Sequence, residues 1–226
     1  MAETGFIQDR DLELFFDVAV NYIDGNGTSD YRPYLAAKLM SETGMRVSEV
    51  LGERYYYFLN DDGFKVVPIP KKEEADKLGY VCKKYDINGL YVEHVNWTDK
   101  TIFIKRAKGN KSRYIPVSSE ALAIIQIYLE KSGRTSLSKG KLINGMTPKW
   151  LRKVFHRICR EADISMIHPH LFRNTFAVRY LKRRGDIRVL QKILGHSSLT
   201  VTAKYLKYTD KQVFDDYDRV MNQGGD

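Results

Sequence analysis

The chain has 226 residues, of which 43% are hydrophobic, and it carries a formal net charge of +9. This composition is that of an ordinary globular protein and excludes a disordered or collagen-like chain. Cys82 and Cys159 lie far apart and suggest neither a disulfide framework nor a zinc site. No apolar run is long enough for a membrane span, and the N-terminus lacks a signal-peptide pattern, so we expect an intracellular protein without membrane contact.

The predicted elements begin with helices and continue with strands. Helices are expected at 10–23, 33–43 and 46–51, the last two ending at Gly44 and Gly52. Short strands are expected within 53–95, and "TIFIKR" and "RYIPV" should form a hairpin over 101–106 and 113–117. Helices follow at 119–131, 147–162, 169–184, 187–194 and 200–208, with a short one after Asp210. The fold class is therefore α+β, mainly helical with a small antiparallel sheet.

The charge is unevenly distributed. Residues 149–209 contain 14 Lys or Arg and 3 Asp or Glu, whereas residues 1–30 contain one Arg and seven acidic residues. Such polarity favours one defined surface that binds a polyanion. A basic excess of this kind points toward nucleic acid or another anionic surface.

Six polar side chains form the candidate site, and Glu49 is a supporting residue. His170 and Arg173 are three residues apart and share a helix face, as do Arg46 and Glu49. The others are Lys108, His196 and Tyr205. Each one alone is typical of a structural or surface residue. Together they supply what a phosphodiester transfer without metal needs. Arginine forks bind phosphate oxygens, Lys or His donates a proton, and a Tyr with a phenol pKa of about 10 is the nucleophile.

These residues lie in motifs that resemble those of the tyrosine recombinases, also called the phage integrase family. "TGMRVSEVLG" (43–52) resembles the first arginine box, and "KRAKGNKSRYIPV" (105–117) resembles the lysine hairpin. "HPHLFRNTFA" (168–177) is similar to the His-x-x-Arg box, and "LGHSSLTVTAKY" (194–205) to the Gly-His box with the nucleophile. The motifs occur in the family's order over residues 6–210, and the resemblance implies a mainly helical catalytic domain.

The resemblance also implies a role for each residue. Arg46 and Arg173 would hold the scissile phosphate, and Glu49 would orient the first arginine helix. Lys108 would protonate the leaving 5′ oxygen, with Lys111 as its rival. Tyr205 would attack and form a 3′-phosphotyrosyl link, without metal, ATP or another cofactor.

The two histidines complete the implied site. His170 would act as a base or hydrogen-bond partner, and His196 would bind a non-bridging oxygen. Tyr208 is the rival nucleophile, and His168 is interpreted as a cap beside Pro169. The residues expected to contact double-stranded DNA are Lys111, Arg113, Lys149, Arg152, Lys153, Lys204 and Lys207.

The chain departs from the family pattern in three places. It begins close to the catalytic domain, although members usually have a separate N-terminal domain that clamps DNA. Residues 53–92 form an unusually long insertion. Asn174 follows the second arginine, where many members have His.

We interpret 1–226 as one catalytic domain, composed of 5–52, 53–95, 96–118, 119–209 and a tail at 210–226. The tail contains Val213, Phe214, Tyr217 and Val220 and could dock on a neighbouring subunit or on its own domain. A recombinase would act as a tetramer on DNA. The alternatives are a type IB topoisomerase-like enzyme, a DNA-binding protein without catalysis and a metal-dependent nuclease, although no carboxylate cluster with ligand spacing favours the nuclease.

Overall fold

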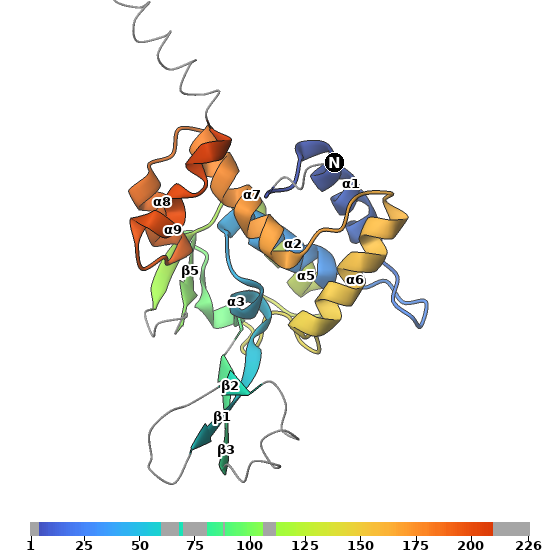
Figure 1. The fold of residues 1–226 in the computed structure, drawn as a ribbon. Helices are drawn as coiled ribbons and strands as arrows, with labels where there is room; N and C mark the ends of the chain where they lie inside the picture. The colour runs from blue at the N-terminus through green and yellow to red at the C-terminus, as the bar shows by residue number, and fades with distance from the viewer. Residues whose placement is uncertain (1–4, 60–67, 70–80, 88, 106–111, 210–226) are drawn as a thin grey trace, which may run out of the picture.

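The computed structural model describes residues 5–59, 68–69, 81–87, 89–105 and 112–209, the strands within 53–87 by their backbone alone (Figure 1). Lys108, Lys111 and the tail from residue 210 lie outside these residues. The described part is mainly helical with small antiparallel sheets, so the predicted fold class is confirmed. Its helices are α1 (Asp9–Val20), α2 (Arg32–Thr43), α3 (Val47–Leu51), α5 (Ser119–Lys131), α6 (Pro148–Glu161), α7 (Pro169–Lys182), α8 (Ile187–Leu194) and α9 (Leu199–Ala203).

Local capping signals determine several helix ends. Ser118 and Thr147 accept backbone N–H groups at the starts of α5 and α6, and Asp186 does the same for α8. Gly44 and Gly195 end α2 and α8 in the left-handed conformation that glycine adopts without steric cost. The predicted helices 119–131 and 187–194 are confirmed.

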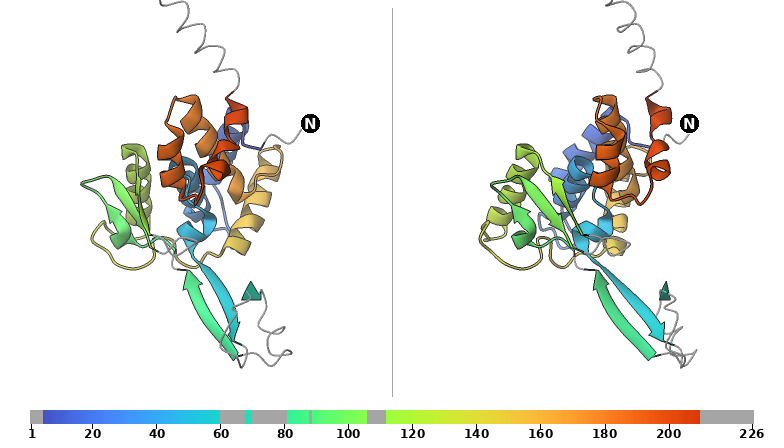
Figure 2. Two further views of the ribbon diagram at one scale, coloured as in Figure 1. Left: turned by 60° about the vertical axis from the view of Figure 1, so that its left-hand side comes forward. Right: turned by 90° about the vertical axis from the view of Figure 1, so that its left-hand side faces the viewer.

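Two three-stranded antiparallel sheets are described. In the first, β4 (Val95–Asn96), β5 (Thr101–Ile104) and β6 (Arg113–Pro116) pair in that order, with Ile102 opposite Ile115 on the buried face. This confirms the predicted hairpin. In the second, β1 (Glu53–Leu59) lies between β2 (Pro68–Ile69) and β3 (Val81–Ile87). The long β1–β3 ribbon projects away from the helical body in every view (Figures 1 and 2).

The core has two parts that meet along α7. Phe15, Phe155 and Phe172 pack together in the larger cluster, with ring centroids 5.0–5.3 Å apart. The smaller cluster joins α7 and α8 to the segment that follows them, and it includes Val178, Leu194 and Tyr205. Burial in this cluster therefore places Tyr205 against α7.

The helix predicted over residues 200–208 is interrupted. Residues 200–208 were expected to form one helix, but α9 ends at Ala203 and a 3₁₀ turn, η2 (Leu206–Tyr208), follows. The Tyr205 N–H donates to Thr202 O, a bond of 3₁₀ type. The prediction of a continuous helix is wrong here because this tighter turn directs the Tyr205 ring into the core. In addition, α7 ends before Gly185, and Arg184 takes the left-handed conformation with φ 62°.

We predict that Gly44→Ala destabilises the protein by about 2–4 kcal/mol, because the residue has φ 66° and a methyl group there would overpack the core. An added Cβ would lie 2.6 Å from Phe176 Cδ1 and 2.7 Å from Leu194 Cδ2. Gly133→Ala is the matched control, since Gly133 also has φ 66° but nothing within 4 Å of an added Cβ. Urea unfolding should show a clearly smaller loss for the control, and equal losses would contradict the packing argument.

Candidate active site

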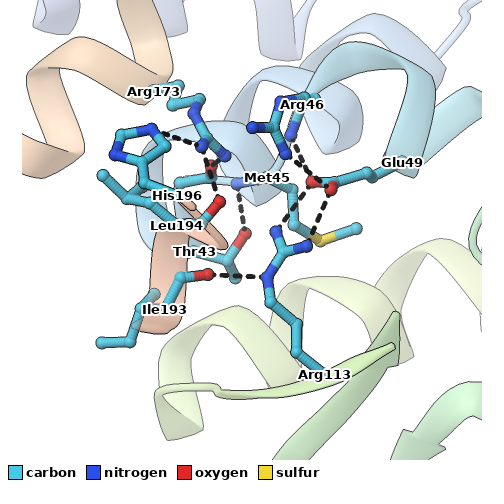
Figure 3. Close-up of polar contacts among 10 residues, drawn as sticks. Thr43, Met45, Arg46, Glu49, Arg113, Arg173, Ile193, Leu194 and His196 are labelled. Atoms are coloured by element: carbon cyan, nitrogen blue, oxygen red, sulfur yellow. Dashed lines mark hydrogen bonds and ion pairs between the residues drawn. The ribbon is translucent and has the colours of Figure 1, made fainter. Parts of the chain in front are cut away.

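Arg46 and Glu49 form a reciprocal pair at the start of α3. The backbone N–H of Arg46 donates to Glu49 Oε2 at 2.8 Å, and its Nη1 donates to Oε1 at 3.1 Å (Figure 3). Glu49 is buried, whereas the Arg46 side chain keeps 22% of its surface exposed. The pair therefore holds the Arg46 guanidinium at the surface of the site.

Arg113, on β6, is the second arginine that donates hydrogen bonds to Glu49. Its Nη1 and Nη2 donate to the two carboxylate oxygens at 2.9 and 3.0 Å, and its Nε donates to Ile193 O at 2.8 Å. Only 11% of the side chain is exposed. Arg113 was expected to contact DNA. The structure instead turns its guanidinium into the protein, where it ties the hairpin to α3 and to the end of α8.

The charge state of Glu49 follows from these contacts. Burial alone would raise its pKa, but the hydrogen bonds and charges of Arg113 and Arg46 lower the pKa below its ordinary value. Glu49 is therefore a carboxylate at neutral pH. A buried carboxylate with two arginine partners fixes both cations in place.

Arg173 lies deeper than Arg46 and is 2% exposed. Its Nη1 donates to Gly44 O and its Nη2 to Leu194 O, both at 2.6 Å. Burial, with the neighbouring charge of Arg46, lowers the pKa of Arg173 to about 9. The group is still a cation at neutral pH, and its Nε–H and one Nη1–H are not used by these bonds.

His196 follows Gly195 and lies beside Arg173. Its Nε2 is 3.0 Å from Arg173 Nη2, and its Nδ1 is 2.9 Å from Thr202 Oγ1. Arginine can only donate, so Nε2 accepts and the proton of the neutral ring lies on Nδ1. Burial and the charges of Arg173 and Arg46 lower the His196 pKa to about 4. The ring is therefore neutral at neutral pH.

Tyr205 is buried beside this cluster, with 3% of its surface exposed. Its hydroxyl donates to Asn174 Oδ1 at 2.8 Å. Burial raises its pKa, while the charges of Arg173 and Arg46 act in the opposite direction. The phenol is thus within electrostatic reach of both arginines. The rival Tyr208 packs against the same small cluster, with its ring against Phe6.

His170 lies one turn before Arg173 on α7 and is exposed. The loss of some of its water contacts lowers its pKa, and the positive charges of four neighbours lower it further, namely Arg173, Arg46, Lys204 and Arg152. Arg152 belongs to α6, so the N-terminal part of this helix lies near the site. The other basic residues predicted to contact DNA from α6 and from the tyrosine segment are exposed, namely Lys149, Lys153 and Lys207.

The structure brings together Arg46, Glu49, Arg173, His196 and Tyr205, as the sequence motifs predict. Sequence reasoning missed the inward role of Arg113, the Thr202 contact of His196 and the Asn174 contact of Tyr205. No local sequence pattern predicts these contacts. The residues are brought together either by the tertiary fold or by an irregular turn of the backbone. Within the described ranges, no cluster of three His, Cys, Asp or Glu could hold a metal ion, and no helix is long and apolar enough to cross a membrane.

Comparison with known proteins identifies the family. Residues 84–212 match the model of the phage integrase family, and the chain belongs to this family. Tyrosine recombinase XerC of Halalkalibacterium halodurans is 32% identical over 142 residues, which are 57% of this chain and 46% of that protein. XerC of Oceanobacillus iheyensis is 26% identical over 265 residues, covering 92% of this chain and 86% of that protein. The chain thus spans about half the length of the first relative.

Solved structures of recombinases have a similar fold. The XerA recombinase structure has a TM-score of 0.65 at 20% identity, covering 95% of this chain and 64% of that one. The XerH site-specific recombinase bound to palindromic difH substrate has a TM-score of 0.60 at 19% identity, covering 94% of this chain and 52% of that one. At such identities the likeness establishes the fold.

We predict that Arg113→Met destabilises the protein at pH 7 by about 2–4 kcal/mol, because it removes three hydrogen bonds and leaves Glu49 with one arginine. The Glu49 pKa is lowered in the folded protein, so its stabilising effect is present above its unfolded pKa and is lost as pH falls through the folded one. The difference between wild type and variant should therefore shrink below about pH 4.5. Urea unfolding between pH 7 and pH 3 measures it.

The matched control is Arg157→Met. Arg157 pairs with Glu161 at 2.9 Å, but both side chains are 43% exposed. An exposed pair contributes less than about 1 kcal/mol. A loss for Arg113→Met no larger than this control, or a difference independent of pH, would contradict the role assigned to Arg113.

Proposed function

We propose that this chain is the catalytic part of a site-specific DNA recombinase that cleaves and rejoins DNA through a 3′-phosphotyrosyl intermediate. The observation that carries this proposal is the assembly of Arg46, Arg173 and His196 beside a buried Tyr205. The family membership and the recombinase names of the relatives support it.

The scissile phosphate would bind between the two catalytic arginines. The Arg46 side chain is partly exposed. Two carbonyl contacts orient the Arg173 guanidinium, and its Nε–H and one Nη1–H are not used by these bonds. Two planar donor forks neutralise the charge that develops on a pentavalent phosphorus. The bound anion would also raise the pKa of His196, so that its Nε2 becomes protonated and donates to a non-bridging oxygen.

Chemistry would then proceed by one substitution at phosphorus. Tyr205 Oη forms a bond to phosphorus while the bond to the 5′ oxygen breaks. His170, neutral at neutral pH because its pKa is lowered, accepts the phenol proton. Lys108 gives a proton to the leaving oxygen. Attack by a 5′-hydroxyl of another strand reverses these steps and restores the tyrosine.

The assembly on DNA is part of the same proposal. We infer a tetramer that brings two duplexes together, with the tail at 210–226 docking on a neighbouring subunit. A type IB topoisomerase-like enzyme would use the same side chains on one duplex as a monomer. Joining of ends from two duplexes by the purified protein supports the recombinase, whereas relaxation of a supercoiled plasmid alone supports the topoisomerase.

We predict that Tyr205→Phe abolishes the covalent adduct and leaves DNA binding intact, because it removes only the attacking oxygen. The assay uses a nicked suicide duplex in EDTA, followed by a denaturing gel. Tyr208→Phe is the matched control and should retain the adduct. An adduct that persists in Tyr205→Phe and disappears in Tyr208→Phe would identify Tyr208 as the nucleophile, and loss of wild-type activity in EDTA would indicate a metal-dependent nuclease.

We also predict a steep decrease in DNA affinity with salt, because exposed lysines and arginines that bind phosphates displace counterions. Changing Lys149, Arg152 and Lys153 to Gln should reduce the slope of log affinity against log salt by about 2–3, at roughly 0.9 for each phosphate contact. Fluorescence anisotropy with a labelled duplex at several salt concentrations measures both slopes. An unchanged slope in the triple variant would remove α6 from the DNA interface.

A further inference from the structure

Asn174 joins the tyrosine segment to the N-terminal part of the chain. Its Oδ1 accepts the hydrogen bond from Tyr205 at 2.8 Å, and its Nδ2 donates to Gly5 O at 2.9 Å. The amide thus has a partner on each side. Among the described residues, Asn174 is the hydrogen-bond partner found for the Tyr205 hydroxyl.

Residues Gly5–Ile7, which we name the N-terminal strap, pack over the same region. The Ile7 N–H donates to Thr175 Oγ1 at 2.8 Å, next to Asn174 on α7. The Phe6 ring meets Tyr208 edge to face with centroids 5.0 Å apart. An added Cβ on Gly5 would collide with the Tyr208 hydroxyl. The strap therefore contacts both α7 and the turn that carries Tyr205.

The docked phenol is a poor nucleophile. An amide oxygen accepts a hydrogen bond but cannot take the proton, so the contact with Asn174 favours the neutral hydroxyl. Burial also raises the Tyr205 pKa, with a smaller contribution in the same direction from Tyr208, while the charges of Arg173 and Arg46 lower it. Lys204 lies over the outer face of the ring, with Nζ 4.9 Å from the centroid.

We propose that Asn174 is a positioning residue that holds the Tyr205 hydroxyl in a resting position, and that the N-terminal strap reinforces this hold. Cleavage then requires the hydroxyl to leave Asn174 and turn to the phosphate. This inference rests on the proposed role of Tyr205 as the nucleophile. Asn174 would thus control when the Tyr205 hydroxyl can reach the phosphate.

The first test is Asn174→Leu, which keeps the side-chain volume and removes both hydrogen bonds. Single-turnover cleavage of the nicked suicide duplex should be about 3–10-fold faster, because one hydrogen bond that stabilises the resting state is lost. Phe6→Ala, which weakens the strap without touching Asn174, should change the rate in the same direction. A slower or unchanged rate in both variants overturns the proposal.

Ile187→Ala is the matched control. Ile187 packs against the same small cluster as Tyr205, but its apolar side chain cannot form a hydrogen bond with the hydroxyl. General loosening of the cluster would accelerate cleavage in the control as well. An equal acceleration in Ile187→Ala would therefore contradict a specific role for Asn174.

A second readout needs no DNA. In protein labelled with 3-fluorotyrosine, the resonance that is missing in Tyr205→Phe is the ¹⁹F resonance of Tyr205. The midpoint of its pH titration gives the pKa of the phenol. The midpoint should fall by about 0.5–1 pH unit in Asn174→Leu. An unchanged midpoint overturns the proposal. If the wild type forms no adduct, the proposed function fails, and this titration alone decides whether Asn174 holds the tyrosine.

Discussion

Two backbone carbonyl groups, Gly44 O at the end of α2 and Leu194 O at the end of α8, accept hydrogen bonds from the buried Arg173 guanidinium. Both ends carry unpaired carbonyls and the negative pole of the helix dipole, so a cation is stabilised there. The left-handed Gly44 and Gly195 allow the chain to turn away at these points. The orientation of Arg173 thus depends on three helices, and movement of α8 would displace its guanidinium directly.

The buried site contains more positive than negative charge. Arg46, Arg113 and Arg173 surround one carboxylate, Glu49, and its two oxygens are occupied by two of the three arginines. The remaining positive charge lowers the pKa values of His170 and His196. A cluster of this kind is stabilised by an added anion, and the neutral His196 can then take up a proton as the anion binds. The charge of the site therefore favours an anion over a cation.

Much of this arrangement could be predicted from the sequence. The helix boundaries at Ser118 and Thr147 and the hairpin of β5 and β6 follow from capping and alternation, which are local. The site residues followed from the resemblance of four sequence motifs to those of the family. The inward turn of Arg113 could not be predicted, because an arginine beside a basic hairpin has the same local pattern whether it contacts DNA or a buried carboxylate.

The interruption at Tyr205 has a similar cause. Periodicity favoured a continuous helix, but burial of the ring against Val178 and Leu194 outweighs the loss of regular hydrogen bonds. That burial positions the proposed nucleophile and also raises its pKa. When a phosphate binds Arg46 and Arg173, their positive charges are neutralised and no longer favour the phenolate. Activation of Tyr205 must then come from its release from the buried position and from a base. His170 suits this role, because the bound anion would raise its pKa and so make it a stronger base.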